Sequence, residues 1–168
     1  MTLPLAVALS FWGTLLANVM AWALIHTGSG YLVHRLPVDR LQRDGWLLRP
    51  HRIEAGGRFY TRVLGIRTWK DHLPEAGALF SGGVSKRSLT GDLAGGLDRF
   101  VVETRRAERG HWLALCGGPI FALWNPLSGL VLMLAYGVSV NVPFIAVQRY
   151  NRQRVQRVLA GRATRTGR

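Results

Sequence analysis

The sequence predicts an all-α integral membrane protein with one N-terminal transmembrane helix, basic interfacial helices and a C-terminal apolar helical hairpin. The first observation behind this fold class is that residues 1–33 and 112–147 contain no Lys, Arg, Asp or Glu. The second is that residues 34–111 hold fifteen basic and nine acidic side chains. Charges sorted into blocks in this way are typical of chains in which apolar spans alternate with aqueous segments. With 168 residues, the chain is expected to form one compact unit or a small bundle.

The N-terminal segment, residues 1–33, is predicted to hold the transmembrane helix. Leu3 to Ile25 is a run of 23 uncharged residues. As a helix it covers about 34 Å, enough for a hydrocarbon core of roughly 30 Å. It lacks the basic start and short apolar core of a signal peptide, so we expect it to be retained. Because the arginines that follow favour the cytosolic side, the N-terminus is expected outside a bacterial cytoplasmic membrane.

Residues 34–98 are predicted to form a basic cytosolic and interfacial segment. Residues 45–77 mix aromatic residues with arginines and are broken by glycines, so we expect short amphipathic helices on the membrane surface. Residues 80–96 are rich in Gly and Ser and are predicted to be a loop. Helical periodicity then returns in steps of three and four residues, at Leu97, Val101 and Thr104 or Arg105.

Residues 99–148 are predicted to be a charged helix leading into the apolar hairpin. The uncharged run would be about 54 Å long as one helix, which is too long for a single crossing. Asn-Pro dipeptides favour turns, so we place the reversal near Asn125–Ser128. Leu127–Val147 is then long enough to return to the cytosolic side.

Two further expectations concern the ends of this hairpin. The first arm, residues 112–124, is too short to cross alone, so either its helix begins upstream in the charged stretch or the arm is re-entrant. Residues 149–168 are predicted to be a basic cytosolic tail, so the membrane protein is expected to be multi-pass.

The net charge of +13 with 48% hydrophobic residues would suggest a nucleic-acid binder if the chain were soluble. Because the basic residues border apolar spans, we expect anionic membrane lipids or the phosphates of a soluble cofactor as partners, and no nucleic acid. The single Cys116 excludes a disulfide framework, and its apolar surroundings predict a packing role. The five histidines show no zinc spacing, so no metal site is expected.

Four ionisable side chains are predicted to share one face of the charged helix. Helical spacing places Arg106 beside Glu103 and places His111 between Glu103 and Glu108. A carboxylate beside an imidazole holds one tautomer and raises its basicity, as a general base requires. The alternative is that these are solvated interfacial charges, whose pairs are each worth roughly a few tenths of a kcal/mol.

Asn141 and Pro143 stand out in the last predicted span. If Gln148 and Arg149 mark the interface, Asn141 lies roughly 10 Å deep. Pro143 removes a helical donor and frees the carbonyl group of Ser139. Polar groups at this depth are expected to line a protein-enclosed or wet cavity. The alternative is a structural kink in which Asn141 bonds a neighbouring helix.

Three blocks of sequence occur in the order and approximate spacing of a known family. They are IRTWKD at 66–71, ETRRAERGHW at 103–112 and NVPFIAVQRYNRQR at 141–154. Together they resemble the bacterial glycosyl-4,4'-diaponeurosporenoate acyltransferases, small membrane proteins of the staphyloxanthin pathway. The resemblance covers most of the chain but little of residues 72–98. The positions that it carries over are Trp69, Lys70, Glu103, Arg106, Glu108, His111, Trp112, Asn141, Pro143, Gln148, Arg149, Tyr150, Asn151 and Arg152.

The resemblance implies esterification of a sugar hydroxyl of a glycosylated carotenoid acid by a fatty acyl group. An acyl-coenzyme A or acyl-carrier thioester is expected as co-substrate, with no bound cofactor. We expect His111, oriented by Glu108 or Glu103, to take the hydroxyl proton. The expected oxyanion ligands are Asn141, Gln148 or Arg149. The expected ligands of the donor phosphates are Lys70, Arg149 and Arg152. The other residues expected to bind substrate or donor are Trp69, Arg106, Trp112, Tyr150 and Asn151.

Two alternatives stay open at this point. The first is a non-enzymatic membrane protein that binds anionic lipids or scaffolds a partner. The second keeps acyl transfer but takes another glycolipid or a polyprenyl sugar as acceptor. The oligomeric state is left open.

Overall fold

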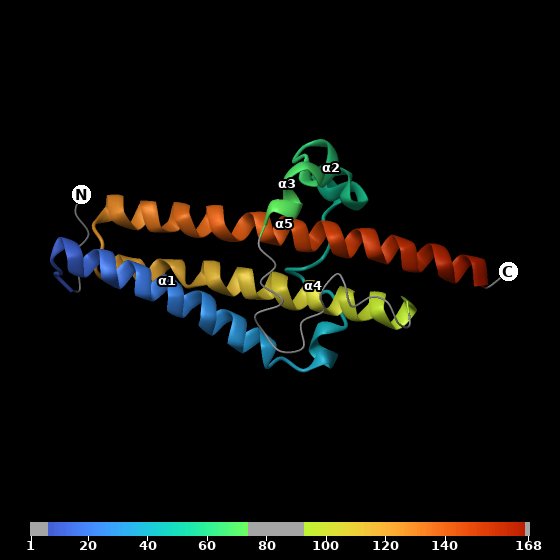
Figure 1. The fold of residues 1–168 in the computed structure, drawn as a ribbon, viewed down its shortest axis with the longest axis horizontal. Coiled ribbons are helices and arrows are strands. Elements are labelled where there is room, and N and C mark those ends of the chain that lie inside the picture. Colours follow the sequence, from blue (N-terminus) through green and yellow to red (C-terminus); the bar gives the residue numbers. More distant parts are fainter. Residues whose placement is uncertain (1–6, 74–92, 167–168) are drawn as a thin grey trace. The chain divides into compact units, whose positions relative to one another are not determined.

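The computed structural model of this chain describes residues 7–73 and 93–166, and every regular element within them is a helix. The predicted all-α class is confirmed for these residues. Figure 1 follows the elements along the chain. In order they are α1 (Phe11–His34), the 3-10 helices η1 (Val38–Leu41) and η2 (Arg52–Gly57), α2 (Arg58–Arg62), α3 (Ile66–Trp69), the 3-10 helix η3 (Lys70–His72), α4 (Leu93–Cys116), the 3-10 helix η6 (Gly118–Leu123) and α5 (Leu127–Thr166).

The chain divides into two compact units, each assembled from two separate stretches of sequence. Unit 1 consists of Met1–Arg35 and Arg109–Pro143, and unit 2 consists of Leu36–Glu108 and Phe144–Arg168. α4 and α5 therefore contribute residues to both units, whereas α1 belongs to unit 1. The predicted segments were continuous because they followed charge along the sequence, while each unit joins stretches that touch only after folding.

In unit 1, α1 begins later than the predicted span. Val7 to Ser10 are not helical, because Ser10 caps the helix: its Oγ accepts a hydrogen bond from the backbone N–H of Gly13 at 3.2 Å. The predicted helix start at Leu3 falls on residues 1–6, which lie outside the described residues. The helix also continues past the predicted end at Ile25, as far as His34.

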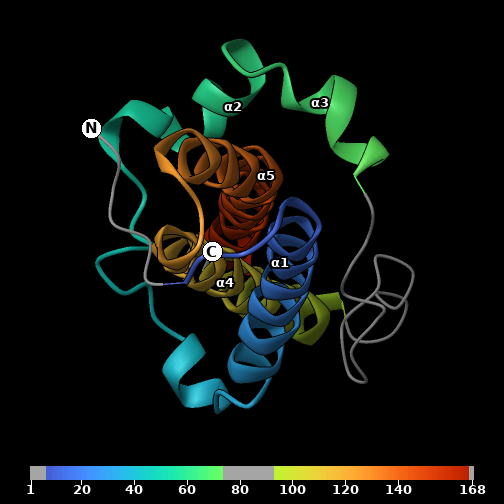
Figure 2. The same cartoon turned by 90° about the vertical axis from the view of Figure 1, so that its left-hand side faces the viewer.

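Trp22 on α1 is the centre of the apolar packing in unit 1. Its ring is buried, with its centroid 4.9 Å from that of Phe121 and 5.4 Å from that of Tyr136. The ring also lies against Gly137 on α5, where a Cβ atom would be 2.6 Å from the indole. Gly117 allows a similar approach by Ile25, whose side chain would be 3.0 Å from a Cβ. Figure 2 views the helices of this unit nearly end-on.

The reversal between α4 and α5 lies where the sequence predicted it, around Asn125. Asn125 exchanges side-chain hydrogen bonds with Asn18 of α1, at 2.8 and 3.1 Å, and Trp124 Nε1 donates to Asn18 Oδ1 at 2.8 Å. The first arm is not one helix, since α4 ends at Cys116 and η6 follows. α4 begins upstream, in the charged stretch, as in the first of the two predicted arrangements. Cys116 is exposed, so its predicted packing role is wrong.

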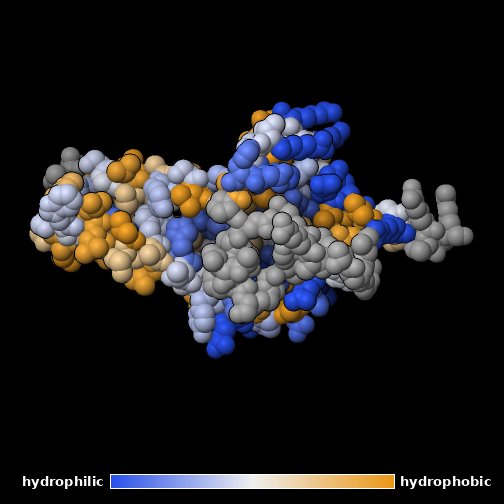
Figure 3. Space-filling model, in the orientation of Figure 1, coloured by the Kyte–Doolittle hydropathy of each residue, from blue (hydrophilic) through white to orange (hydrophobic). Residues whose placement is uncertain are grey.

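Of the described helices, α5 is the one that is long and apolar enough to cross a membrane. Only 22% of its most apolar stretch is buried. α1 also exposes large apolar side chains, among them Phe11 and Trp12, each 74% exposed, and Leu24, 67% exposed. Much of this apolar surface is visible in orange in Figure 3. α5 is continuous through Thr166, so the predicted basic tail extends this helix.

Unit 2 contains the short helices predicted between residues 45 and 77. Left-handed backbone conformations separate them, at Ala55, Gly56 and Gly57 and again at Gly65. The glycines account for the breaks because a residue without Cβ adopts positive φ at little cost. Residues 74–92, which include most of the predicted Gly/Ser loop, lie outside the described residues. The predicted end of that loop at Gly96 is wrong, because α4 begins at Leu93.

The buried face of α4 in unit 2 follows helical periodicity. Its buried residues are Val101, Thr104, Arg105 and Glu108. This stripe confirms the predicted steps of three and four residues, but half of it is charged. The apolar core of unit 2 lies elsewhere and consists of Tyr60, Ile66, Ala146 and Tyr150, with Phe59, Trp69 and Val147 packed against it.

Candidate active site

A hydrogen bond between His111 on α4 and Asn141 on α5 organises the polar centre of unit 1. His111 Nδ1 lies 2.9 Å from Asn141 Oδ1. The amide nitrogen of Asn141 donates to the carbonyl oxygen of Gly137 at 2.9 Å. Because a carbonyl can only accept, this second bond fixes the orientation of the amide and leaves its oxygen facing the imidazole. Nδ1 of His111 therefore carries the proton, and Nε2 holds the lone pair that a general base needs.

Burial also favours the neutral form of this imidazole. His111 precedes the uncharged run of the sequence, and desolvation by burial lowers its pKa below the ordinary value of 6.5. The hydrogen bond to Asn141 acts in the opposite direction, and the nearby His26 lowers the pKa further. At neutral pH the side chain is therefore uncharged and able to accept a proton.

His26 and Trp22 of α1 add two polar atoms to unit 1 that the sequence analysis missed. His26 Nδ1 donates to the carbonyl oxygen of Trp22 at 2.9 Å, so Nε2 is the acceptor nitrogen of this tautomer. His26 Nε2 and Trp22 Nε1 are both buried and find no hydrogen-bond partner among the described residues. Each costs about 1–3 kcal/mol in that state. A histidine within an apolar helix is itself a signal for function, because such residues are costly in membranes.

A buried ionic cluster occupies the interior of unit 2, with Arg149 at its centre. Its Nε donates to Glu108 Oε1 at 2.6 Å and its Nη1 donates to Glu54 Oε1 at 2.7 Å. Its third nitrogen, Nη2, donates to the carbonyl oxygen of Leu47. Burial raises the pKa of the neighbouring Tyr60 well above its ordinary value, and Glu54 raises it further, so Tyr60 remains protonated.

Arg152 and Arg105 complete this cluster. Arg152 Nη2 lies 2.7 Å from Glu108 Oε2 and donates to the carbonyl oxygen of Leu48 at 3.1 Å. Arg105 Nε donates to Asp44 Oδ1 at 2.7 Å, and Arg152 Nε lies 3.6 Å from the same oxygen. Three guanidinium groups thus meet three carboxylates, and Glu108 has no exposed surface. Such a cluster holds its backbone segments in one arrangement.

Comparison with known proteins shows one family. The chain matches the glycosyl-4,4'-diaponeurosporenoate acyltransferase family over residues 44–161. It belongs to this family. The protein of that name from Staphylococcus aureus strain N315 is 28% identical over 142 residues, which cover 83% of this chain and 84% of the relative. The protein of the same name from strain bovine RF122 / ET3-1 is 26% identical over 140 residues, with the same coverage. No solved structure matches the chain.

The chain is therefore an acyltransferase, and the non-enzymatic alternative is wrong. The region matched by the glycosyl-4,4'-diaponeurosporenoate acyltransferases begins at Asp44 and includes the whole ionic cluster together with His111 and Asn141. Trp22 and His26 precede it. The family match thus covers the ionic cluster of unit 2 and the pair His111 and Asn141 of unit 1, but not the two buried nitrogen atoms of α1.

The geometry favours roles for Glu108, Arg149 and Arg152 that differ from those expected of them in this acyltransferase. Glu108 was expected to orient His111, but both of its oxygens lie within ion-pair distance of arginines. Arg149 and Arg152 were expected to bind donor phosphates, but their guanidinium groups are buried against carboxylates. Asn141 was expected as an oxyanion ligand, yet its amide N–H donates to Gly137 and its oxygen faces His111.

The remaining predicted site residues of the acyltransferase do not form one cluster with His111 and Asn141. Glu103 Oε2 is 3.2 Å from Arg106 Nε, which confirms their predicted proximity, and Arg106 also donates to the carbonyl oxygen of Leu36. Trp69 Nε1 donates to the carbonyl oxygen of Leu64, and Lys70 is paired with Asp71. Half-buried positions are held by Trp112 on α4 and by Pro143, Gln148 and Asn151 on α5. Tyr150 is buried in the apolar core of unit 2.

Proposed function

We propose that the chain transfers a fatty acyl group from a thioester to a sugar hydroxyl of a membrane-anchored glycolipid, such as a glycosylated carotenoid acid. The relatives named above carry a glycosyl diaponeurosporenoate in their name, which supports this acceptor class. The single observation that carries the proposal is the hydrogen bond from His111 Nδ1 to Asn141 Oδ1, with the Asn141 amide held by Gly137. It prepares a neutral imidazole for proton transfer.

The proposed reaction uses Nε2 of His111 as the general base. The sugar hydroxyl gives its proton to Nε2 while its oxygen forms a bond to the thioester carbonyl carbon. The carbon–sulfur bond then breaks, and the proton passes from His111 to the departing thiolate. Asn141 is a positioning residue in this scheme, because it holds the tautomer without touching the reacting atoms.

Membrane embedding of unit 1 is part of the proposal. The exposed apolar side chains of α1 and the apolar stretch of α5 support it, since soluble surfaces rarely expose so many large apolar residues together. The arginine-rich unit 2 would then face the cytosolic surface, in agreement with the positive-inside tendency. An acceptor with a long apolar tail keeps its sugar at the headgroup level, which is the depth at which a residue bordering the uncharged run would act.

The two unpartnered atoms of α1 support a sugar as the acceptor. A hydroxyl group both donates and accepts, so it complements the acceptor His26 Nε2 and the donor Trp22 Nε1. Binding of a polyol would remove the cost of leaving these buried atoms unsatisfied. A hydrocarbon would not.

The test is acyl transfer by membranes that contain His111→Ala, followed by mass spectrometry of the extracted glycolipid. We expect the rate to fall about 100-fold or more, because a general base contributes on that order. His72→Ala is the matched control, since it removes an exposed histidine of unit 2 and should leave the rate unchanged. Wild-type rates in His111→Ala, with the protein present in membranes at equal amount, would exclude His111 as the base.

A further inference from the structure

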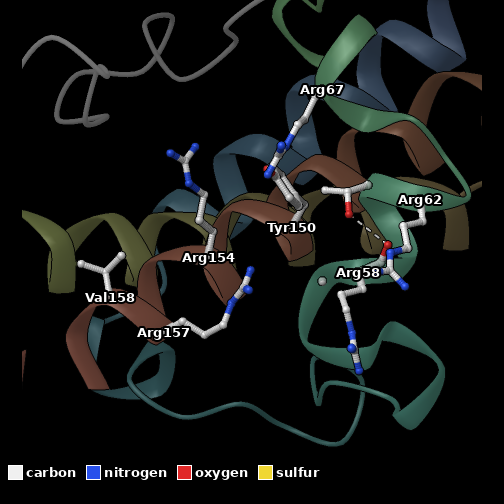
Figure 4. A pocket seen from close by; sticks show the side chains of 9 residues that line it. Arg58, Arg62, Arg67, Tyr150, Arg154, Arg157 and Val158 are labelled. Carbon is white, nitrogen blue, oxygen red and sulfur yellow. Dashed lines mark hydrogen bonds between the residues drawn. The ribbon is translucent and has the colours of Figure 1, made fainter. Parts of the chain in front are cut away.

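Unit 2 contains a pocket that none of the predicted site residues except Tyr150 lines. Its volume is about 500 Å³, which lies within the range of small-molecule sites. One side is formed by α2 and α3 with the glycine that precedes α2, and the other side by α5. Figure 4 shows these side chains. The lining residues are Gly57, Arg58, Thr61, Arg62, Arg67, Tyr150, Arg154, Arg157 and Val158.

Of the nine lining residues that the structure describes, five are arginines and none is acidic. Three of these arginines donate a hydrogen bond through Nε. Arg58 and Arg157 donate to backbone carbonyl oxygens, and Arg67 donates to the Tyr150 hydroxyl. Among the residues that the structure describes, no carboxylate forms an ion pair with any of the five. The contrast is with the ionic cluster of the same unit, in which each arginine faces a carboxylate.

The arginines that α5 contributes to the ionic cluster and those that it contributes to the pocket lie on different faces of this helix. Arg149 and Arg152 face the buried carboxylates, with Gln153 beside them. The pocket is lined instead by Tyr150, Arg154, Arg157 and Val158, which recur at helical steps of three and four residues. Arg149 and Arg152 are thus engaged in the interior, whereas the neighbouring face presents cations to a cavity. Like charges gathered without counter-charges repel one another, so the site favours an anion with several charges.

We propose that this pocket binds the phosphates of a nucleotide-bearing acyl donor, a coenzyme A thioester. The inference rests on the proposed function, because it names the donor of that reaction. Coenzyme A carries a pyrophosphate and a 3′-phosphate within one small molecule, and arginine forks bind such groups in a bidentate manner. A phospholipid headgroup or the phosphopantetheine of a carrier protein offers a single phosphodiester, which would leave most of the five guanidinium groups uncompensated.

The experiment measures binding of free coenzyme A to the full-length protein in phosphatidylcholine nanodiscs by titration calorimetry. The pocket variant is Arg62→Gln/Arg154→Gln, which removes two exposed lining cations from opposite sides of the pocket. The control is Arg43→Gln/Arg49→Gln, which removes the same charge from exposed positions of unit 2 outside the pocket. We expect the pocket variant to bind about tenfold or more weakly, and the control to bind like the wild type. Adenosine 3′,5′-bisphosphate should compete with coenzyme A.

A second experiment distinguishes a nucleotide from a lipid headgroup as the ligand of the pocket. Both double variants are reconstituted into mixed vesicles of phosphatidylcholine and phosphatidylglycerol and extracted in detergent, and analysis of the lipid that each retains should show equal amounts of phosphatidylglycerol. Equal affinity of both variants for coenzyme A, or a selective loss of phosphatidylglycerol binding in the pocket variant, would overturn the proposal. His111→Ala should bind coenzyme A normally while failing to transfer the acyl group. A failure of the pocket proposal is thereby distinguishable from a failure of the proposed base.

Discussion

Arg149 and Glu108 form an ion pair of 2.6 Å between Nε and Oε1, and both side chains are buried. The pair joins α5 to α4 inside unit 2. Glu108 also neutralises Arg152. Its removal therefore leaves two buried cations with less compensation, which is expensive in a low-dielectric interior.

Glu108→Gln is accordingly expected to destabilise the protein by about 3–5 kcal/mol. Glu103→Gln is the control, because its pair with Arg106 is partly exposed and should contribute about 1 kcal/mol or less. Denaturant unfolding in detergent, followed by circular dichroism, measures both. A Glu108→Gln protein with wild-type stability but no activity would instead support the role that the sequence predicted for Glu108 at His111.

Asn141→Leu is expected to lower kcat by at least about tenfold, because His111 then loses the acceptor that keeps the proton on Nδ1. The KM for the donor should change little, since Asn141 acts through His111. Asn141→Asp keeps an acceptor of the same shape and should retain more activity. An Asn141→Leu enzyme with an unchanged kcat would show that the tautomer is set by another group.

The pH dependence of the acyl-transfer rate should follow the protonation of the His111 imidazole. Burial lowers the pKa of His111, so the base stays unprotonated until the pH falls below 6.5, and activity should decline only on that acid side. Asn141→Asp places a carboxylate beside the ring, which raises the pKa and moves the acid limb to higher pH by on the order of one unit. Initial rates of wild type and variant across a pH series would check this. Superimposable acid limbs would contradict it.

Gly137→Ala is expected to destabilise unit 1 by about 1–3 kcal/mol, because the new methyl group would meet the Trp22 ring at 2.6 Å. Gly28→Ala is the matched control. Gly28 is also helical, nothing lies within 4 Å of its Cβ position, and alanine there should stabilise the helix by about 0.5–1 kcal/mol. Thermal unfolding of the two variants measures the difference. Equal effects would mean that Trp22 can move away from α5.

The parts of this fold that could be predicted from the sequence depend on local periodicity. The stripe on α4 from Val101 to Arg105 was predictable because steps of three and four residues fix a helix face. The turn at Asn125 was predictable because Asn-Pro breaks a helix locally. Both are properties of neighbours in the sequence, so no tertiary information was needed.

The partners of the charged residues could not be predicted, because they come from distant segments. Arg149 meets Glu54, which is 95 positions away, and Arg105 meets Asp44, 61 positions away. When these pairings are not known, arginines beside an apolar run are interpreted as ligands of lipid phosphates at the membrane surface. The same limit applied to His111 and Asn141: each residue was singled out, but their contact depends on how α4 and α5 pack.

The ionic cluster of unit 2 removes as many positive as negative charges from the surface, since three arginines meet three carboxylates. Folding therefore leaves the excess of +13 undiminished for the rest of the molecule to display. In a bilayer this excess should attract anionic lipid headgroups to the protein, and that attraction should weaken steeply with ionic strength. The internal charges, shielded from mobile ions, should hold unit 2 together under the same conditions.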